Sequence, residues 1–169
     1  MEVRLAGLVP NSNANGLGLR DVIFAQGCSH GCKECFNKHT WDPKGGKACD
    51  CDEIIAQCVD RSYLAGVTFS GGDPLEQPQA FAYIAQGLKK HNINIWCYTG
   101  YTWEELMELA KTNQYIMDLL KNIDTLVDGP YISSLHDENI EWRGSSNQRI
   151  IDVVQSLKQH KVVIDNRFK

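Results

Sequence analysis

Three cysteines lie within one stretch of eight residues, Cys28-Ser29-His30-Gly31-Cys32-Lys33-Glu34-Cys35. Thiolates are the usual protein ligands of zinc ions and of iron–sulfur clusters. The whole chain carries seven cysteines, an odd number, and so tight a group in a reducing compartment indicates a metal site rather than disulfides. Any fold of this chain must therefore present these thiols together on one short loop.

The spacing of these cysteines allows two kinds of metal centre. Three thiolates on one loop can hold three corners of a [4Fe–4S] cluster and leave the fourth iron open. S-adenosylmethionine (SAM) could bind that iron through its amino and carboxylate groups, and a reduced cluster could then cleave its C–S bond, giving methionine and a 5′-deoxyadenosyl radical. The alternative is a structural zinc site, with His30 or His39 completing a tetrahedral shell.

Short apolar runs alternate with segments of helical periodicity along the chain. We expect buried strands over residues 21–26, 66–70, 92–99 and 124–127. Helices are expected to begin near Asp50 and at Thr102, and a third carries Phe81, Ile84 and Leu88 at helical spacing. The tail is predicted as two further strands, 149–153 and 161–164, joined by a short turn.

This alternation predicts an α/β fold with a mainly parallel sheet. Such sheets place their functional loops at the carboxyl ends of the strands. Three segments are expected to meet there: the cysteine loop, Gly71-Gly72-Asp73 and Thr99-Gly100-Tyr101. No linker or composition change divides the chain, so we expect one domain over residues 1–169.

The segment Gly71-Gly72-Asp73-Pro74 has two interpretations. Two glycines let a ligand approach the backbone closely, and main-chain groups there could bind the methionyl end of SAM. The same residues also suit a plain strand-to-helix turn, in which Asp73 caps the helix and Pro74 occupies its first position.

Composition excludes several classes of function. The net charge is −4 with both signs mixed along the chain, and no basic stripe predicts nucleic-acid binding. No apolar run approaches the roughly 20 residues of a membrane helix. Residues 1–10 lack the apolar stretch of a secretory signal, so we expect a cytoplasmic protein.

Two motifs resemble those of the radical SAM superfamily: Cys28-x3-Cys32-x2-Cys35 and Ser70-Gly71-Gly72-Asp73-Pro74. Further segments resemble a narrower family, the activating proteins of anaerobic ribonucleoside-triphosphate reductase. They are Cys35-Phe36-Asn37-Lys38-His39-Thr40-Trp41, Trp96-Cys97-Tyr98-Thr99-Gly100-Tyr101, Val127-Asp128-Gly129 and Trp142-Arg143-Gly144-Ser145-Ser146-Asn147-Gln148-Arg149-Ile150.

The resemblance implies an open, shortened (β/α) partial barrel that binds a [4Fe–4S] cluster through Cys28, Cys32 and Cys35. It also implies SAM contacts from two groups of residues, Glu34, Cys35 and Phe36 at the adenine and Gly71, Gly72 and Asp73 at the methionyl end.

The implied reaction installs a glycyl radical on the large subunit of anaerobic ribonucleoside-triphosphate reductase, with electrons from reduced flavodoxin or a similar donor. No side chain is expected to act as a general acid or base, because the cluster and SAM supply the chemistry. The alternatives are an activase of a pyruvate formate-lyase type enzyme and a structural zinc-binding module. The long segment from Trp142 to Ile150 argues against the first of these.

The remaining cysteines and His30 are expected to lie outside the chemistry. Cys49 and Cys51 flank Asp50, but no convincing set of four ligands for a second cluster accompanies them. Cys58 and Cys97 fall on apolar faces and are predicted to be core residues. His30 is interpreted as a solvated loop residue, the alternative being that it approaches the cluster or the partner.

Overall fold

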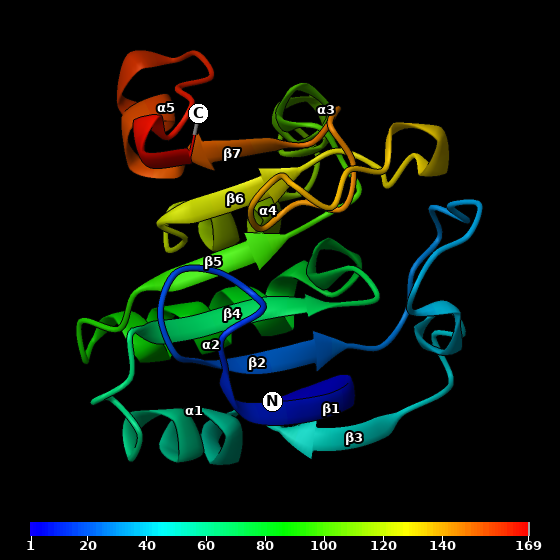
Figure 1. Cartoon of the computed structure of the whole chain (residues 1–169). Helices are drawn as coiled ribbons and strands as arrows, with labels where there is room; N and C mark the ends of the chain where they lie inside the picture. The colour runs from blue at the N-terminus through cyan, green and yellow to red at the C-terminus, as the bar shows by residue number, and fades with distance from the viewer. Residues whose placement is uncertain (169) are drawn as a thin grey trace.

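A seven-stranded sheet runs through residues 1–168, the part of the chain that the computed structural model describes (Figure 1). Its strands are β1 (Glu2–Ser12), β2 (Arg20–Ala25), β3 (Lys47–Asp50), β4 (Gly66–Gly71), β5 (Ile95–Tyr98), β6 (Thr125–Asp128) and β7 (Arg149–Asp152). Their order in the sheet is β3-β1-β2-β4-β5-β6-β7. The expected α/β class is thereby confirmed, and the seven strands form one sheet.

The sheet is parallel only in its centre. Strands β2, β4, β5 and β6 pair in parallel. The pairings of β1 with β2, of β1 with β3 and of β6 with β7 are antiparallel. The prediction of a mainly parallel sheet is therefore right for the four buried runs and wrong for the two edges of the sheet. At one edge, strands β1 and β3 were not predicted from the sequence.

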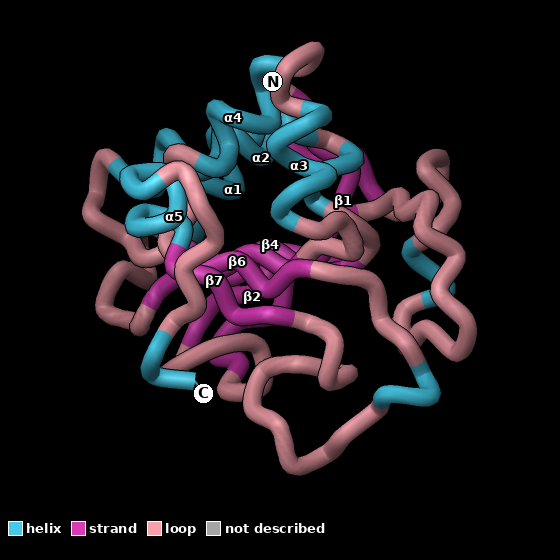
Figure 2. The backbone as a smooth tube through the Cα atoms, turned by 90° about the horizontal axis from the view of Figure 1, so that it is seen from above, coloured by secondary structure: helices cyan, strands magenta, loops and turns pink. Residues whose placement is uncertain are grey.

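Helices pack against one face of this sheet. They are α1 (Cys51–Val59), α2 (Pro78–Lys89), α3 (Trp103–Leu109), α4 (Gln114–Leu120) and α5 (Val153–Gln159), with 3₁₀ turns at Lys38–Thr40, Pro74–Glu76, Ser133–Leu135 and Asn166–Phe168. Figure 2 shows α1 to α4 on one side of the strands and mostly loops on the other. None of the helices in residues 1–168 is both long and apolar enough to span a bilayer.

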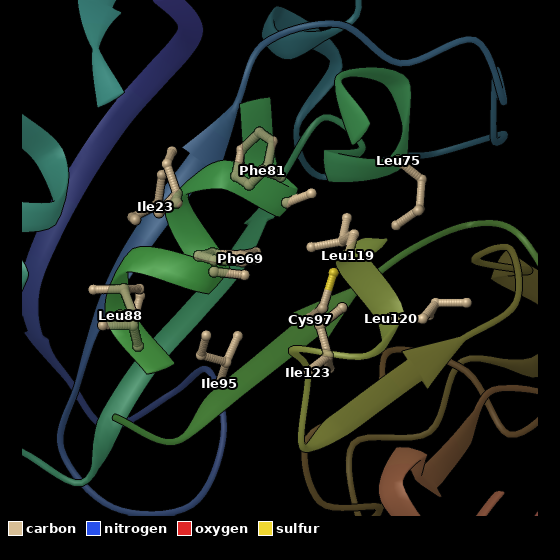
Figure 3. Close-up of a cluster of buried hydrophobic side chains, with 14 of the residues drawn as sticks. Ile23, Phe69, Leu75, Phe81, Leu88, Ile95, Cys97, Leu119, Leu120 and Ile123 are labelled. Carbon is tan, nitrogen blue, oxygen red and sulfur yellow. The ribbon is translucent and has the colours of Figure 1, made fainter. Parts of the chain in front are cut away.

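The main core lies between the helices and the sheet (Figure 3). Phe69 on β4 meets Phe81 on α2 edge-to-face, with ring centroids 5.1 Å apart. Cys58 and Cys97 are 2% and 0% exposed, so the prediction that they are core residues is confirmed. Burial of aromatic and aliphatic side chains of this kind is the main favourable term in folding.

Local polar signals fix where several helices begin. The Asp50 side chain accepts hydrogen bonds from the backbone N–H groups of Asp52 and Glu53 and caps α1. Thr102 and Glu105 form the reciprocal capping box predicted for α3. Both caps satisfy backbone donors that the first helical turn leaves without partners.

The tail differs from its prediction. Residues 149–152 do form strand β7, but the expected short turn after it is helix α5. Asp152 caps this helix by accepting a hydrogen bond from Gln155 N, and Val153 is buried against the core. The predicted strand at residues 161–164 is reduced to an isolated bridge between Ile151 and Ile164.

A buried arginine joins the start of β2 to its neighbours. Arg20 is 1% exposed, and its guanidinium donates to Thr68 Oγ1, to Leu17 O and to both oxygens of Asn94. It also lies 5.6 Å from the ring centroid of Trp96. Burial lowers the pKa of Arg20 to about 10. The charge is tolerated because nearly every donor has an oxygen partner.

We expect Arg20→Met to lower the free energy of unfolding by about 3 kcal/mol, because it leaves buried acceptors without donors. Urea denaturation of the metal-free protein measures this. The control is Lys111→Met, which removes an exposed ion pair with Glu108 and should change stability by no more than about 0.5 kcal/mol. A loss below about 1 kcal/mol for Arg20→Met would contradict the structural role of this residue.

Candidate functional site

A cavity of about 210 Å³ opens where three strands of the parallel sheet end. The cysteine loop follows β2, Gly71 ends β4 with Gly72 next to it, and Thr99 and Gly100 follow β5; all three segments line this cavity. Figure 1 shows the arrowheads of β2, β4 and β5 at the same edge. The predicted meeting of these loops is confirmed, because the carboxyl ends of parallel strands share one edge of a sheet.

The cysteine loop is held at both of its ends. Gly27 N donates to Thr40 O at 2.7 Å, and Cys28 N donates to Trp41 O at 3.1 Å. The Gln26 side chain donates to Asp42 O at 2.8 Å. The loop therefore leaves β2 and returns beside its own start, which confines the three cysteines to a short excursion over the end of the sheet.

Cys28, Cys32 and Cys35 all line the cavity and are half-buried. Burial, with Asp73 and Glu76 nearby, raises the pKa of Cys28 to about 11. The metal-free thiol is therefore neutral, and a metal must displace its proton on binding. Thiol donors facing a cavity are the chemistry that iron binds in iron–sulfur proteins.

A zinc site and a [4Fe–4S] cluster need different arrangements of ligands. Within residues 1–168 no three Cys, His, Asp or Glu side chains converge as ligands of one metal ion. A tetrahedral zinc site needs that convergence, whereas each cysteine of a cubane binds a different iron. His30, one of the two candidates for a fourth zinc ligand, has its Nε2 2.6 Å from Asp73 Oδ2.

Gly71 and Gly72, at the end of β4, are required by close backbone packing. A Cβ on Gly72 would lie 2.3 Å from Gly27 O, and one on Gly71 would lie 2.5 Å from Ala25 N. Gly72 N donates to Ala25 O, and Asp73 N donates to Gly27 O, both at 2.8 Å. These contacts dock the end of β4 against the start of the cysteine loop while both glycines still face the cavity.

Asp73 is buried and does not line the cavity. Its Oδ1 accepts from Leu75 N at 2.9 Å, so the turn interpretation of this segment is confirmed. Its Oδ2 meets His30 Nε2 at 2.6 Å and accepts from Thr99 Oγ1 at 2.8 Å and Gly100 N at 2.9 Å. One carboxylate thus joins the three loops of the site.

His30 is not the solvated residue that the sequence analysis expected. Its side chain is only 15% exposed, and the hydrogen bond to Asp73 raises its pKa. This contact has no local sequence signal, because the buried carboxylate lies 43 residues away along the chain. The available signal was a histidine within the spacer of the cysteine motif, followed later by an aspartate at a strand end.

The other wall of the cavity includes residues of the segment from Trp142 to Ile150. Gly144 and Gln148 line it together with Tyr131. Gln148 Oε1 accepts from Gly144 N at 2.9 Å, and Gln148 Nε2 donates to Gly129 O at 3.0 Å. This glutamine therefore ties the segment to itself and to Gly129 at the wall of the cavity.

Phe36 and Glu34 occupy different positions on the cysteine loop. Phe36 lines the cavity, is 72% exposed and lies with its ring centroid 5.2 Å from that of Tyr131. Glu34 is exposed, has a left-handed backbone with φ 60° and does not line the cavity. Only Phe36 of these two thus presents a side chain to the space that a ligand would fill.

Asp128, at the end of β6, is buried and bonded to other parts of the protein. It is 1% exposed and accepts hydrogen bonds from Trp103 N at 2.7 Å and from Arg149 Nε at 3.1 Å. Arg149 also bonds Glu104. These contacts attach α3 to β6 and leave Asp128 engaged away from the cavity.

Comparison with known proteins agrees with this geometry. Residues 14–151 match the family model described as a 4Fe-4S single cluster domain. The solved structure of QueE from Escherichia coli shares the fold, with a TM-score of 0.50 over 60% of this chain and 54% of that chain at 20% identity.

Curated relatives match over almost their whole length. The anaerobic ribonucleoside-triphosphate reductase-activating protein of Enterobacteria phage T4 is 31% identical over 90% of this chain and 96% of its own. Those of Vibrio cholerae and Escherichia coli K12 are each 38% identical, over 83% and 82% of this chain and 92% of their own. This chain therefore belongs to the family of anaerobic ribonucleoside-triphosphate reductase-activating proteins, built on a 4Fe-4S single cluster domain.

Proposed function

We propose that this protein is a radical SAM activase that generates a glycyl radical on anaerobic ribonucleoside-triphosphate reductase. The observation that carries the proposal is one cavity lined by three cysteines of a single loop and by the glycine pair at the end of β4. Strands from residue 2 to residue 152 share the sheet beneath that cavity, which supports a single radical SAM domain with the shortened partial barrel of the superfamily.

Cys28, Cys32 and Cys35 are the proposed ligands of a [4Fe–4S] cluster. Among residues 1–168 no further cysteine lines the cavity, so the fourth iron would keep a position for SAM. When bound, the cluster would supply the electron for reductive cleavage of SAM, and so the radical chemistry by which a hydrogen atom is taken from a glycine of the reductase. The chain would contribute three thiols that give up their protons and the cavity that they line.

We assign the SAM contacts to the two sides of the cavity. Main-chain groups of Gly71 and Gly72 would hold the methionyl end, and Asp73 would act by fixing their turn, since both of its oxygens have donors. Cys35 and Phe36 would hold the adenine, with Tyr131 beside Phe36. Glu34 would contribute through its backbone alone, because its side chain lies outside the cavity.

The proposed partner is the large subunit of the reductase. The three relatives named above are all activating proteins of this reductase, which favours it over a pyruvate formate-lyase type enzyme. Phe36 on the cavity wall is an exposed apolar side chain, and so are Ile132 and Leu135, which follow Tyr131 of the same wall. Exposed apolar side chains of this kind suit contact with a protein substrate. All seven cysteines are free thiols, in keeping with a reducing compartment such as the cytoplasm.

We further propose that the electron donor is an acidic protein of the flavodoxin type. The segment from Cys28 to Lys47 carries exposed lysines, Lys33, Lys38, Lys44 and Lys47, against two acidic residues. The whole chain, by contrast, has a net charge of −4. A second cavity of about 310 Å³, lined by Arg4 and Trp41, also reaches Cys28. A locally positive surface beside the cluster ligands would attract an acidic donor.

Cys32→Ala should remove the cluster and abolish 5′-deoxyadenosine formation, because the loop then offers only two thiolates. The measurement is anaerobic reconstitution with iron and sulfide, then reduction with dithionite in the presence of SAM. Cys49→Ala is the matched control and should keep both iron and product. Native amounts of 5′-deoxyadenosine from the Cys32→Ala protein would refute the proposed ligand set.

The double variant Lys38→Glu/Lys44→Glu should slow flavodoxin-driven cleavage of SAM on the order of 10-fold at low salt, because it reverses the local charge. Cleavage driven by dithionite should not change. The control is Lys90→Glu/Lys121→Glu; these exposed lysines follow α2 and α4 and precede β5 and β6, at the opposite edge of the sheet. Equal losses with both reductants would count against a docking role for Lys38 and Lys44.

A further inference from the structure

The spacer between the first two cysteines is joined to two carboxylates of the segment after β4. Ser29 Oγ donates to Glu76 Oε1 at 2.5 Å, at an exposed position. His30 Nε2 lies 2.6 Å from Asp73 Oδ2, where the two side chains are 15% and 1% exposed. Ser29 and His30 are thus both bonded to the segment from Asp73 to Glu76. The contact of Ser29 lies at the surface, and that of His30 lies in the interior.

The β5 loop encloses the imidazole of His30. The His30 ring meets Tyr101 edge-to-face with centroids 4.4 Å apart. A Cβ on Gly100 would lie 2.5 Å from His30 Cδ2, so the ring occupies the space that a side chain at Gly100 would need. The Tyr101 hydroxyl donates to Glu76 at 3.2 Å and closes the same cluster of groups. The position of His30 is therefore set by packing as well as by its hydrogen bond.

The residue that follows His30 provides no restraint of its own. Gly31 has a left-handed backbone with φ 62°, and no atom lies within 4 Å of the place where its Cβ would be. The hydrogen bonds of Gly27 and Cys28 to Thr40 and Trp41 hold the base of the loop but not its middle. The side-chain contacts of Ser29 and His30 thus fix the direction in which the backbone runs between Cys28 and Cys32.

We propose that His30 is a positioning residue for the cluster. Its hydrogen bond to Asp73 holds the Cys28–Cys32 segment against the ends of β4 and β5, so that the thiols face the cavity in the metal-free protein and stay there afterwards. The bond to a buried carboxylate dominates over the exposed Ser29–Glu76 contact, because water competes less in the interior. That His30 keeps the thiols in place after cluster binding rests on the proposed function. That it orients them in the metal-free protein does not.

The test compares His30→Ala, His30→Gln and His39→Gln. Glutamine can still donate to Asp73, whereas alanine cannot. His39 is an exposed histidine of the same loop and serves as the matched control. Hydrogen exchange of the amides of residues 28–35 is measured on the metal-free protein, and the rate of cluster loss to an iron chelator is measured on the reconstituted protein.

We expect His30→Ala to exchange these amides and to lose its cluster on the order of 10-fold to 100-fold faster, since loop opening precedes both events. His30→Gln should recover most of the protection, and His39→Gln should match the unaltered protein. Circular dichroism should show the same thermal midpoint for all variants within a few degrees.

Unchanged exchange and cluster loss in His30→Ala would overturn the proposal. So would a glutamine variant as impaired as the alanine variant, or a His39→Gln variant equally impaired, because the hydrogen bond would then not be the cause. Collapse of the whole fold in His30→Ala would also overturn it, since the proposed effect is confined to the loop. Failure of the unaltered protein to take up iron would instead refute the proposed function, and exchange in the metal-free protein would still report on His30.

Discussion

The Asp73 carboxylate is the interaction on which the geometry of the site depends. It is buried, and its two oxygens contact groups from the cysteine loop, from its own turn and from the β5 loop, namely His30, Leu75, Thr99 and Gly100. A buried carboxylate is costly in free energy unless it is well hydrogen-bonded. Loss of one hydrogen bond to Asp73 therefore weakens the other bonds that this carboxylate makes. The three loops therefore hold one another in place rather than resting separately on the sheet.

Backbone packing supports this carboxylate. Gly72 brings the end of β4 against Gly27 O, and Gly100 leaves room for the imidazole of His30. A side chain at either position would separate two of the loops. These glycines thus matter first for the approach of protein segments to each other, and the space that remains above them is the cavity into which Cys28 and Cys32 face.

Elements with a clear local signal were predicted well. The buried runs β2, β4, β5 and β6 and the capping box of α3 follow from hydrophobic pattern and cap chemistry alone. Strand β1 escaped prediction because its register shifts in pairing with β2 interrupt the alternation that marks a half-buried strand. Helix α5 was read as a turn because its apolar face is short and depends on Val153 packing onto the core.

By itself, the sequence determined the proposed ligands and their order: three thiols at a fixed spacing, a glycine pair after the next buried strand, and the alternation that places both at the carboxyl edge of a sheet. Only the tertiary structure decided what His30 and Asp73 do. Spacing along the chain specifies which groups are available, but hydrogen bonding and burial depend on contacts across 43 residues of sequence. The fold therefore joins His30, which the sequence pattern predicts to be solvated, to the buried carboxylate of Asp73 beside the cysteine loop.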